Sequence, residues 1–324
     1  MATVFVTGAN GKLGRATCRA LLADGHQVRA LARSEPTESL GVSWTRGDIL
    51  DPSTYIEVLR GCDAVVHYAA ELREPAQMDN TNVAATMRLL EASSALGIRY
   101  FCFTSSVSVY GSPRRRLVTE DSPPVDPTRS MTDQYFNRAY VVEYARTKAA
   151  AERVIQQGQL NLVIDIIRPS VVRDRDELLE IGDMSKLVRM FMAPRQSQYV
   201  LTEDLAHAVC HLMTQGLSES PRVEVFNLAD DTNPTYREIM EVGYALTRQA
   251  KFQVPVSLPA LADMMKYRLT YRRFNVGVPL GYQKISNKKL LATGFTFPIG
   301  VKNALNTITE TNRADESAVG SGIS

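Results

Sequence analysis

Near its start the chain reads Thr3-Val-Phe-Val-Thr7-Gly8-Ala9-Asn10-Gly11-Lys12-Leu13-Gly14. The β-branched run predicts a strand at 3–7, and apolar residues at helical spacing predict a helix at 13–24. Glycines between a strand and a helix allow a tight turn and let the backbone approach a pyrophosphate, which the free N–H groups of the helix then bind. A glycine triplet elsewhere indicates a plain turn, but this context predicts a dinucleotide site formed by Gly8, Asn10, Gly11, Lys12 and Leu13.

The alternation of strand and helix continues along the chain. Further strands are predicted at 27–32, 42–45, 63–68, 99–104, 160–167 and 223–228, and further helices at 55–60, 82–96, 140–157 and 203–213. Strict alternation implies parallel βαβ units. We therefore expect an α/β fold, a doubly wound parallel Rossmann-type sheet with a smaller C-terminal substrate-binding lobe.

The pattern also suggests a division into domains. We expect the dinucleotide-binding Rossmann domain to take residues 1–168 plus about 200–230, and the substrate lobe to take about 169–199 plus 231–308. Within the lobe, the apolar stretch 258–271 is either ordinary packing or a pocket wall. The polar tail 309–324 contains Gly and Ser and is expected to be disordered.

Composition narrows the function class. The chain of 324 residues is 44% hydrophobic and 22% charged, which is ordinary for a soluble globular protein. Its net charge of +2 excludes the basic footprint of a dedicated nucleic-acid binder, and no apolar run reaches the length of a membrane span. A strand beginning at Thr3 leaves no room for a signal peptide. The thiols have no pair spacing, so we expect a cytoplasmic protein with reduced Cys18, Cys62, Cys102 and Cys210.

The ends of the next strands add candidate cofactor contacts. An acidic residue after the second strand would accept bonds from the 2′-hydroxyl of NAD, but the chain has Arg33 there. A planar guanidinium suits a 2′-phosphate, so NADP is the expected cofactor and NAD the alternative. Asp48, followed by Ile49, is placed to bond the adenine amino group. The small residues Ala69 and Ala70 leave room for a ribose or pyrophosphate.

Two groups of residues suggest carbonyl chemistry. Tyr144 and Lys148 stand four apart on a predicted helix and so share one face. A neighbouring ammonium favours phenolate, so we expect it to lower the tyrosine pKa and make Tyr144 a proton donor and acceptor. Ser105 and Ser106 end the fifth strand, at the edge where doubly wound sheets bind ligands. One of these hydroxyls is a candidate to hold the substrate oxygen.

These motifs together resemble the extended short-chain dehydrogenases/reductases, also called the NAD-dependent epimerase/dehydratase family. The resemblance covers about residues 1–230 in the family's order: Thr7-Gly8-x-x-Gly11-x-x-Gly14, Gly47-Asp48, His67-x-Ala69-Ala70, Asn82-Val83, Ser105-Ser106-x-x-Val109-Tyr110-Gly111, Tyr144-x-x-x-Lys148 and Arg168-Pro169. It implies a catalytic set of Ser106, Tyr144 and Lys148. It also implies a homodimer, formed by the helices at 82–96 and 140–157.

The resemblance assigns further residues to the nicotinamide end of the cofactor. Lys148 would hold the nicotinamide ribose, with Asn82 near the same end. The segment 169–172, including Pro169 and Val171, would lie against the nicotinamide amide.

The chain departs from the family at the following segment. It lacks the usual Tyr-Gly-Pro turn and has Ser170 where many sugar-nucleotide members carry Asn. We therefore expect an NAD(P)(H)-dependent oxidoreductase that acts on a carbonyl or secondary alcohol of a small molecule. A nucleotide-sugar epimerase or dehydratase is the alternative, and a non-catalytic NADP-sensing regulator is the second alternative. The complete set of Ser106, Tyr144 and Lys148 argues against the regulator.

Two other features of the sequence bear on function. His207 and His211 lie one helical turn apart, but no third ligand is evident, so no metal site is expected. The run 114–116 consists of three arginines and is either a grip for an anionic substrate or, more often, a solvated loop.

Overall fold

The structure is a computed structural model that describes residues 1–36, 38, 40–113, 115–135, 137–158, 160–254, 259, 262, 265 and 281–308. The apolar stretch 258–271, apart from 259, 262 and 265, lies outside the described residues. So do the tail 309–324 and Arg114 of the arginine run.

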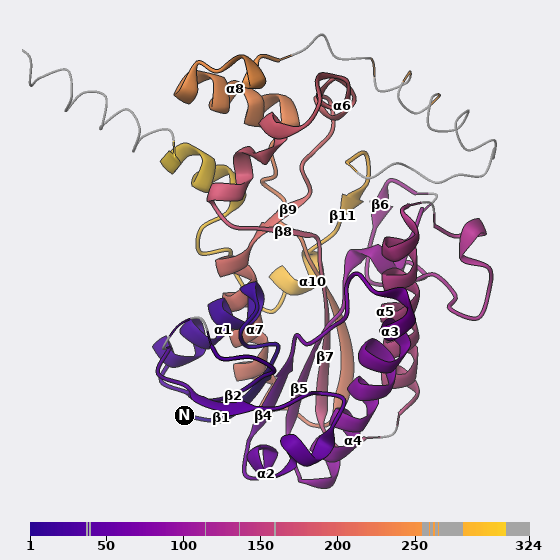
Figure 1. Ribbon diagram of the computed structural model, residues 1–324, viewed down its shortest axis with the longest axis vertical. Helices are drawn as coiled ribbons and strands as arrows, with labels where there is room; N and C mark the ends of the chain where they lie inside the picture. Colours follow the sequence, from indigo (N-terminus) through magenta and orange to yellow (C-terminus); the bar gives the residue numbers. More distant parts are fainter. Residues whose placement is uncertain are drawn as a thin grey trace, which may run out of the picture.

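The centre of the molecule is one parallel sheet of seven strands in the order β10-β7-β5-β4-β1-β2-β3 (Figure 1). Its strands are β1 (Thr3–Thr7), β2 (Gln27–Ala32), β3 (Ser43–Arg46), β4 (Ala64–His67), β5 (Tyr100–Thr104), β7 (Val163–Pro169) and β10 (Arg222–Leu228). Every pairing in it is parallel. The order reverses at β1, with β2 on one side and β4 on the other, so the doubly wound expectation is confirmed.

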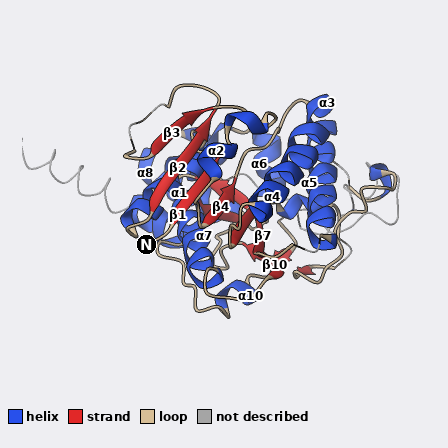
Figure 2. Ribbon diagram, turned by 90° about the horizontal axis from the view of Figure 1, so that it is seen from below, coloured by secondary structure: helices blue, strands red, loops and turns tan. Residues whose placement is uncertain are grey.

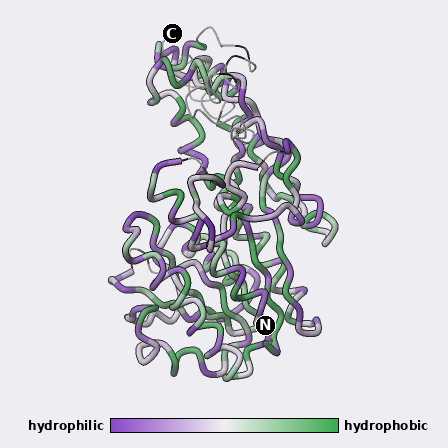
Figure 3. The backbone as a smooth tube through the Cα atoms, turned by 90° about the vertical axis from the view of Figure 1, so that its right-hand side faces the viewer, coloured by the Kyte–Doolittle hydropathy of each residue, from purple (hydrophilic) through white to green (hydrophobic). Residues whose placement is uncertain are grey.

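Helices cover both faces of the sheet (Figure 2). Successive strand residues point to opposite faces, so Val4 and Val6 pack with α1 (Lys12–Ala23) and α7 (Thr202–Gly216). Phe5 instead joins the cluster that includes residues of α4 (Thr86–Ala95) and α5 (Ala139–Gln157). Figure 3 shows hydrophobic stretches of backbone in the part of the molecule that holds the N-terminus. Three cysteines lie in the first core cluster and one in the second: Cys18, Cys102, Cys210 and, in the second, Cys62.

Two predicted helices differ from the structure. The helix expected at 82–96 is three consecutive segments: α3 (Pro75–Met78), a π-helical segment η2 (Asp79–Ala85) and α4. It starts earlier because Pro75 is well suited to the first turn of a helix. The helix expected at 55–60 is shortened to α2 (Ile56–Leu59) after a 3-10 turn, η1 (Pro52–Thr54), in which the Asp51 side chain accepts a hydrogen bond from the Ser53 amide.

The remaining elements form the upper part of the molecule in Figure 1 and the segments that join it to the sheet. β8 (Val171–Arg173) pairs with β9 (Tyr199–Leu201), and β6 (Leu117–Val118) pairs with β11 (Lys284–Ile285). Strands of two or three residues are too short for periodicity to predict. The helical segments are α6 (Lys186–Met192), α8 (Tyr236–Thr247), α10 (Lys288–Leu291), η3 (Val107–Tyr110), η4 (Met131–Asp133), η5 (Asp176–Asp183) and η6 (Ala250–Phe252).

A separate apolar cluster holds the region around β9 together. It brings Leu178 and Ile181 of η5 against Ile239 of α8 and Val301, all fully buried. The proposed division into two domains stays a prediction. Across the part of the chain that the structure describes, no helix combines the length and the hydropathy that a bilayer crossing requires.

Candidate functional site

A cleft of about 610 Å³ opens at the carboxyl edge of the sheet, where the strand order reverses. This edge is where open α/β sheets bind ligands. The lining comes from the glycine loop, the ends of β2, β3, β4 and β5, the segments α3, η2 and α5, the end of β7 and the start of β8: Gly8, Asn10, Gly11, Lys12, Leu13, Gly14, Leu31, Ala32, Arg33, Ser34, Gly47, Asp48, Ile49, Leu50, Tyr68, Ala69, Ala70, Glu71, Leu72, Gln77, Thr81, Thr104, Ser105, Ser106, Tyr144, Lys148, Pro169, Ser170 and Val172. Of the residues predicted from sequence, Asn82 and Val171 do not line it.

The glycine loop forms a cradle that side chains would fill. Gly8 has φ +64, and a Cβ there would lie 2.8 Å from the amide nitrogen of Ala69. A Cβ on Gly14 would lie 2.5 Å from the Cα of Ala9. The loop therefore packs against the end of β4 and the start of α1 through bare backbone. Such a surface, at a helix N-terminus, fits the pyrophosphate of a dinucleotide.

Hydrogen bonds between strand ends hold the floor of the cleft. The Thr7 Oγ1 and His67 Nδ1 atoms lie 2.6 Å apart, and His67 Nε2 lies 2.9 Å from Thr86 Oγ1. Burial, with a smaller contribution from Lys148, lowers the pKa of His67 to about 3, so the ring is neutral and serves as a cross-link. The Ala69 amide donates to Thr7 Oγ1 at 3.2 Å, which ties the loop after β4 to β1.

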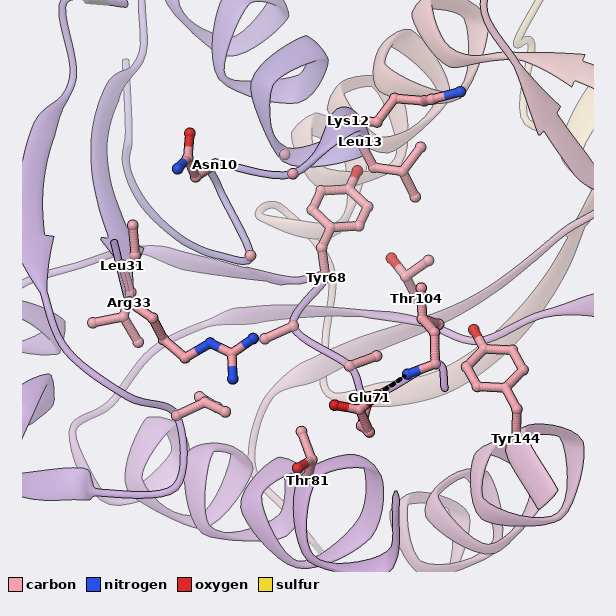
Figure 4. Close-up of a pocket in the computed structure, with 18 of the residues that line it drawn as sticks. Asn10, Lys12, Leu13, Leu31, Arg33, Tyr68, Glu71, Thr81, Thr104 and Tyr144 are labelled. Carbon is pink, nitrogen blue, oxygen red and sulfur yellow. Dashed lines mark hydrogen bonds between the residues drawn. The ribbon is translucent and has the colours of Figure 1, made fainter. Parts of the chain in front are cut away.

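Arg33 and Tyr144 mark opposite ends of the cleft, with the ring of Tyr68 between them (Figure 4). The Tyr68 hydroxyl lies 2.7 Å from Thr17 Oγ1 on α1, so its ring is held at the cleft wall. The sequence reasoning did not select Tyr68, although its place within His67-x-Ala69-Ala70 was a signal.

At the Arg33 end, two carboxylates lie in the lining. Asp48 accepts a bond from the Leu50 amide at 3.0 Å, which fixes the turn after β3. Glu71, not selected from sequence, accepts from three backbone amides at 2.9, 2.9 and 3.1 Å. These bonds, and a smaller contribution from Arg33, lower the Glu71 pKa. The cleft thus carries one arginine and two hydrogen-bonded carboxylates, Asp48 and Glu71.

At the other end, α5 and β5 bring the predicted catalytic residues together. Lys148 is 2% exposed, and its ammonium donates to the Thr104 carbonyl at 2.7 Å and lies 5.8 Å from the centre of the Tyr144 ring. Burial lowers the pKa of Lys148 to about 7, against an opposing contribution from Glu152. Ser106 caps η3 by accepting from the Ser108 amide at 3.1 Å.

The expected lowering of the Tyr144 pKa needs correction. Burial instead raises the pKa of Tyr144. Sequence spacing places Lys148 beside Tyr144 but says nothing about desolvation, which disfavours the charged form of both groups. The chain alone therefore keeps the phenol protonated, ready to donate a proton.

Three predicted cofactor residues have other principal contacts. Asn82 is fully buried; it accepts from the Glu71 amide at 2.8 Å and donates to Thr147 Oγ1 at 3.1 Å. It therefore holds the wall of the cleft from behind. Val171 pairs with β9, and Val172 lines the cleft in its place. Lys12 lines the cleft, but its ammonium points away and binds Glu177 Oε1 at 2.5 Å (Figure 4).

The residues of the cleft fit a nicotinamide dinucleotide. The glycine cradle suits its diphosphate, and the buried Ser170 Oγ, in the lining beside Pro169, has no hydrogen-bond partner in the structure.

Of the two histidines considered as metal ligands, His211 has a different partner, because its Nε2 lies 2.9 Å from Thr293 Oγ1. The described residues contain no group of three or more His, Cys, Asp and Glu side chains arranged to hold a metal ion.

The sequence model of the NAD-dependent epimerase/dehydratase family matches residues 4–172, from the first strand of the sheet to β8. The chain belongs to this family. The roles of individual site residues stay predictions, because the match concerns the segment and not each side chain.

Curated relatives of this epimerase/dehydratase member include reductases. A 2-alkyl-3-oxoalkanoate reductase of Stenotrophomonas maltophilia is 31% identical over 215 residues, 64% of this chain and 60% of that protein. A reductase of the same name from Shewanella oneidensis matches over only 38% of its length. A 4-hydroxy-2-methyl-3-oxo-4-farnesyl-3,4-dihydroquinoline-1-oxide ketoreductase of Stigmatella aurantiaca is 28% identical over 70% of this chain and 67% of its own. The chain thus spans about 60% or less of the first two relatives.

Solved structures share the fold over the whole chain. A short-chain dehydrogenase/reductase superfamily protein from Agrobacterium tumefaciens, with bound NAD, has a TM-score of 0.71 at 23% identity and covers 98% of this chain and 99% of its own. The UDP-glucose 4-epimerase of Thermus thermophilus, in complex with NAD, has a TM-score of 0.66 at 20% identity, covering 96% and 99%. At these identities the likeness establishes the fold.

Proposed function

We propose that the protein is an NAD(P)H-dependent ketoreductase, which reduces a ketone of a small molecule to a secondary alcohol. The observation that carries this proposal is the meeting of Tyr144, Lys148 and Ser106 in the same cleft as the glycine cradle. The Stenotrophomonas and Stigmatella relatives, which are named as a reductase and a ketoreductase, support it. Their partial coverage leaves the substrate of this chain open to test.

Each residue of the set has a defined task. A nicotinamide cofactor held by the glycine loop would supply the hydride for the carbonyl carbon. Tyr144, kept protonated by burial, donates its phenol proton to the carbonyl oxygen, which the Ser106 hydroxyl holds in place. Lys148, anchored on the Thr104 carbonyl, lies beside the ring and stabilises the phenolate left after transfer.

Turnover with a panel of ketones and nucleotide sugars tests this function. We expect the absorbance of NADPH to fall in step with alcohol formation, because a reductase consumes one cofactor per cycle. The alternative is an epimerase, favoured by matches to UDP-glucose 4-epimerases such as that of Lactobacillus helveticus. Isomerisation of a nucleotide sugar without net absorbance change, by protein that retains NAD through gel filtration, would replace the proposal. A protein that binds the cofactor but turns over nothing would be the non-catalytic sensor.

We further propose a preference for NADP(H), because exposed Arg33 points into the cleft where the adenosine ribose is expected. Calorimetric titration of the wild type should give tighter binding of NADPH than of NADH. Arg33→Ala should weaken NADPH binding by about tenfold and leave NADH binding nearly unchanged, since one charge-assisted contact is lost. Arg60→Ala, which removes an exposed arginine paired with Glu57, is the control. Equal affinities in the wild type would contradict the preference.

Assembly and compartment are also proposals. Tyr140 and Val154 of α5 are 39% and 36% exposed, which supports a homodimer formed through the α4 and α5 layer. Light scattering should give twice the mass of 35.9 kDa for the wild type and the single mass for Val154→Glu. Free, buried thiols support the cytoplasm as the compartment.

A further inference from the structure

A carboxylate is buried beneath the catalytic end of the cleft. Glu152 on α5 and Arg168 on β7 are each 2% exposed. The Arg168 Nε donates to the two carboxylate oxygens at 3.0 and 3.2 Å, and its Nη1 donates to the Tyr110 hydroxyl at 2.7 Å. Burying two charges is costly even when they pair, and apolar residues of similar volume often serve stability as well. The pair therefore calls for a reason other than stability.

The same carboxylate engages one of two adjacent serines. Ser105 and Ser106 follow β5, where successive side chains of an extended chain point to opposite sides. The Ser105 hydroxyl donates to Glu152 Oε1 in the interior. The Ser106 hydroxyl stays at the cleft and accepts from the Ser108 amide. Glu152 thus holds the strand end in the orientation that presents Ser106.

Glu152 also lies one helical turn after Lys148, on the same face of α5. The titratable groups around this ammonium, within the described residues, come from three elements: Tyr144 and Glu152 of α5, His67 of β4 and, behind Glu152, Arg168 of β7. His67 is neutral and Tyr144 is protonated. Glu152 is therefore the nearby negative charge that favours the ammonium form of Lys148.

We propose that Glu152 is a positioning residue for the reaction, which fixes Ser105 so that Ser106 faces the substrate and keeps Lys148 charged from the buried side. This rests on the proposed function of the cleft. Because burial lowers the pKa of Lys148 to about 7, the ammonium form is present below that pH and is lost as the pH rises through it. Loss of the Glu152 charge lowers this pKa further, so the active range moves to lower pH.

The test compares Glu152→Gln with Glu152→Asp. We measure the pH dependence of NADPH binding by fluorescence titration, and that of kcat, between pH 5.5 and 9.5. Glu152→Gln keeps the shape of the side chain and is expected to move the alkaline limb of both profiles down by about one pH unit. Glu152→Asp keeps the charge and is expected to retain the wild-type limb. Glu143→Gln removes a carboxylate from the same helix, one that pairs with Arg146, and is the control that leaves the limb in place.

Each outcome has a defined meaning. The proposal is overturned if a folded Glu152→Gln protein keeps the alkaline limb of the wild-type pH profiles. It is also overturned if the alkaline limb of Glu152→Asp is shifted as far as that of Glu152→Gln. If Glu152→Gln does not fold, Ser105→Ala decides: a kcat reduced ~10- to 100-fold with an unchanged limb supports positioning, and a wild-type kcat overturns it. Tyr144→Phe is run beside these variants. Full turnover in Tyr144→Phe would reject the proposed function. The pH dependence of NADPH binding would still test the role of Glu152, because it does not depend on turnover.

Discussion

At the dinucleotide end of the cleft the backbone forms the surface, whereas at the catalytic end side chains form it. Gly8 and Gly14 leave no room for a Cβ, so a diphosphate bound at this loop would meet peptide groups. At the other end, Tyr144 and Lys148 project from α5, and their charge states follow from burial. On the proposed function, the diphosphate contact would be common to NAD and NADP, whereas the reaction would depend on the side chains of Tyr144 and Lys148. Substitutions at the two ends should therefore fail in different ways.

The largest effect is expected at the side-chain end. Tyr144→Phe removes the proton donor and leaves the packing of the ring in place. Turnover should fall ~10²- to 10⁴-fold, while NADPH binding by calorimetry stays close to the wild-type value. A Phe variant with a near wild-type rate would show that Tyr144 is not the proton donor. The proposed difference between the two ends of the cleft would then lose its main support.

Substitution in the glycine loop should weaken the binding of the cofactor. A Cβ on Gly14 would overlap Ala9, so Gly14→Ala is expected to cost ~1–3 kcal/mol, shared between cofactor binding and folding. Calorimetry and urea unfolding measure the two shares. Gly158→Ala is the matched control, because its nearest neighbour would lie 3.4 Å away. If Gly14→Ala bound NADPH with the wild-type affinity, the cradle would not be the diphosphate site.

Asn82 connects the two ends, because its amide group bonds both Glu71 and Thr147. Asn82→Ala removes the partners of the Glu71 amide and carbonyl and the donor to Thr147 Oγ1, and should lower the free energy of unfolding by ~1–3 kcal/mol. Ser93→Ala is the control, since the equally buried Ser93 hydroxyl bonds only within α4, to the Leu89 carbonyl. Equal losses in urea unfolding for the two variants would mean that Asn82 has no special connecting role.

The smallest effect is expected at the ion pair between Lys12 of the glycine loop and Glu177 of η5. These side chains are 36% and 24% exposed, and such pairs contribute at most about 1 kcal/mol. Glu177→Gln should speed NADPH release in stopped flow by up to about fivefold, and 0.5 M salt should reduce the difference. Slower release would mean that the freed Lys12 binds the diphosphate itself.

The sheet was predictable because its signals are local. The β-branched run of β1 and the helical spacing of apolar residues in α1 are visible within a few residues, and so is the glycine loop between a strand and a helix. The ion pair of Lys12 with Glu177 joins residues that are 165 positions apart in the sequence, so no local sequence pattern predicts it. The clamp of Asn82 on Glu71 depends on the π-helical segment η2, which apolar spacing does not distinguish from an ordinary helix.

The charge states at the catalytic end illustrate the other limit. Spacing correctly places Lys148 one turn from Tyr144, but the pKa of each depends on how completely the rest of the folded chain buries it. Desolvation is a property of the assembled fold, so its sign at Tyr144 was the opposite of the expected one.

The four core cysteines give the protein a built-in reporter of its own opening. Burial raises the pKa of Cys18 and Cys210 to about 12 and raises those of Cys62 and Cys102 as well. Alkylating reagents need an accessible thiolate, and the folded protein offers them neither access nor charge. Each thiol is therefore expected to react only when the layer that covers it opens. Mass spectrometry of timed alkylation would thus record, cysteine by cysteine, the order in which the two faces of the sheet come apart.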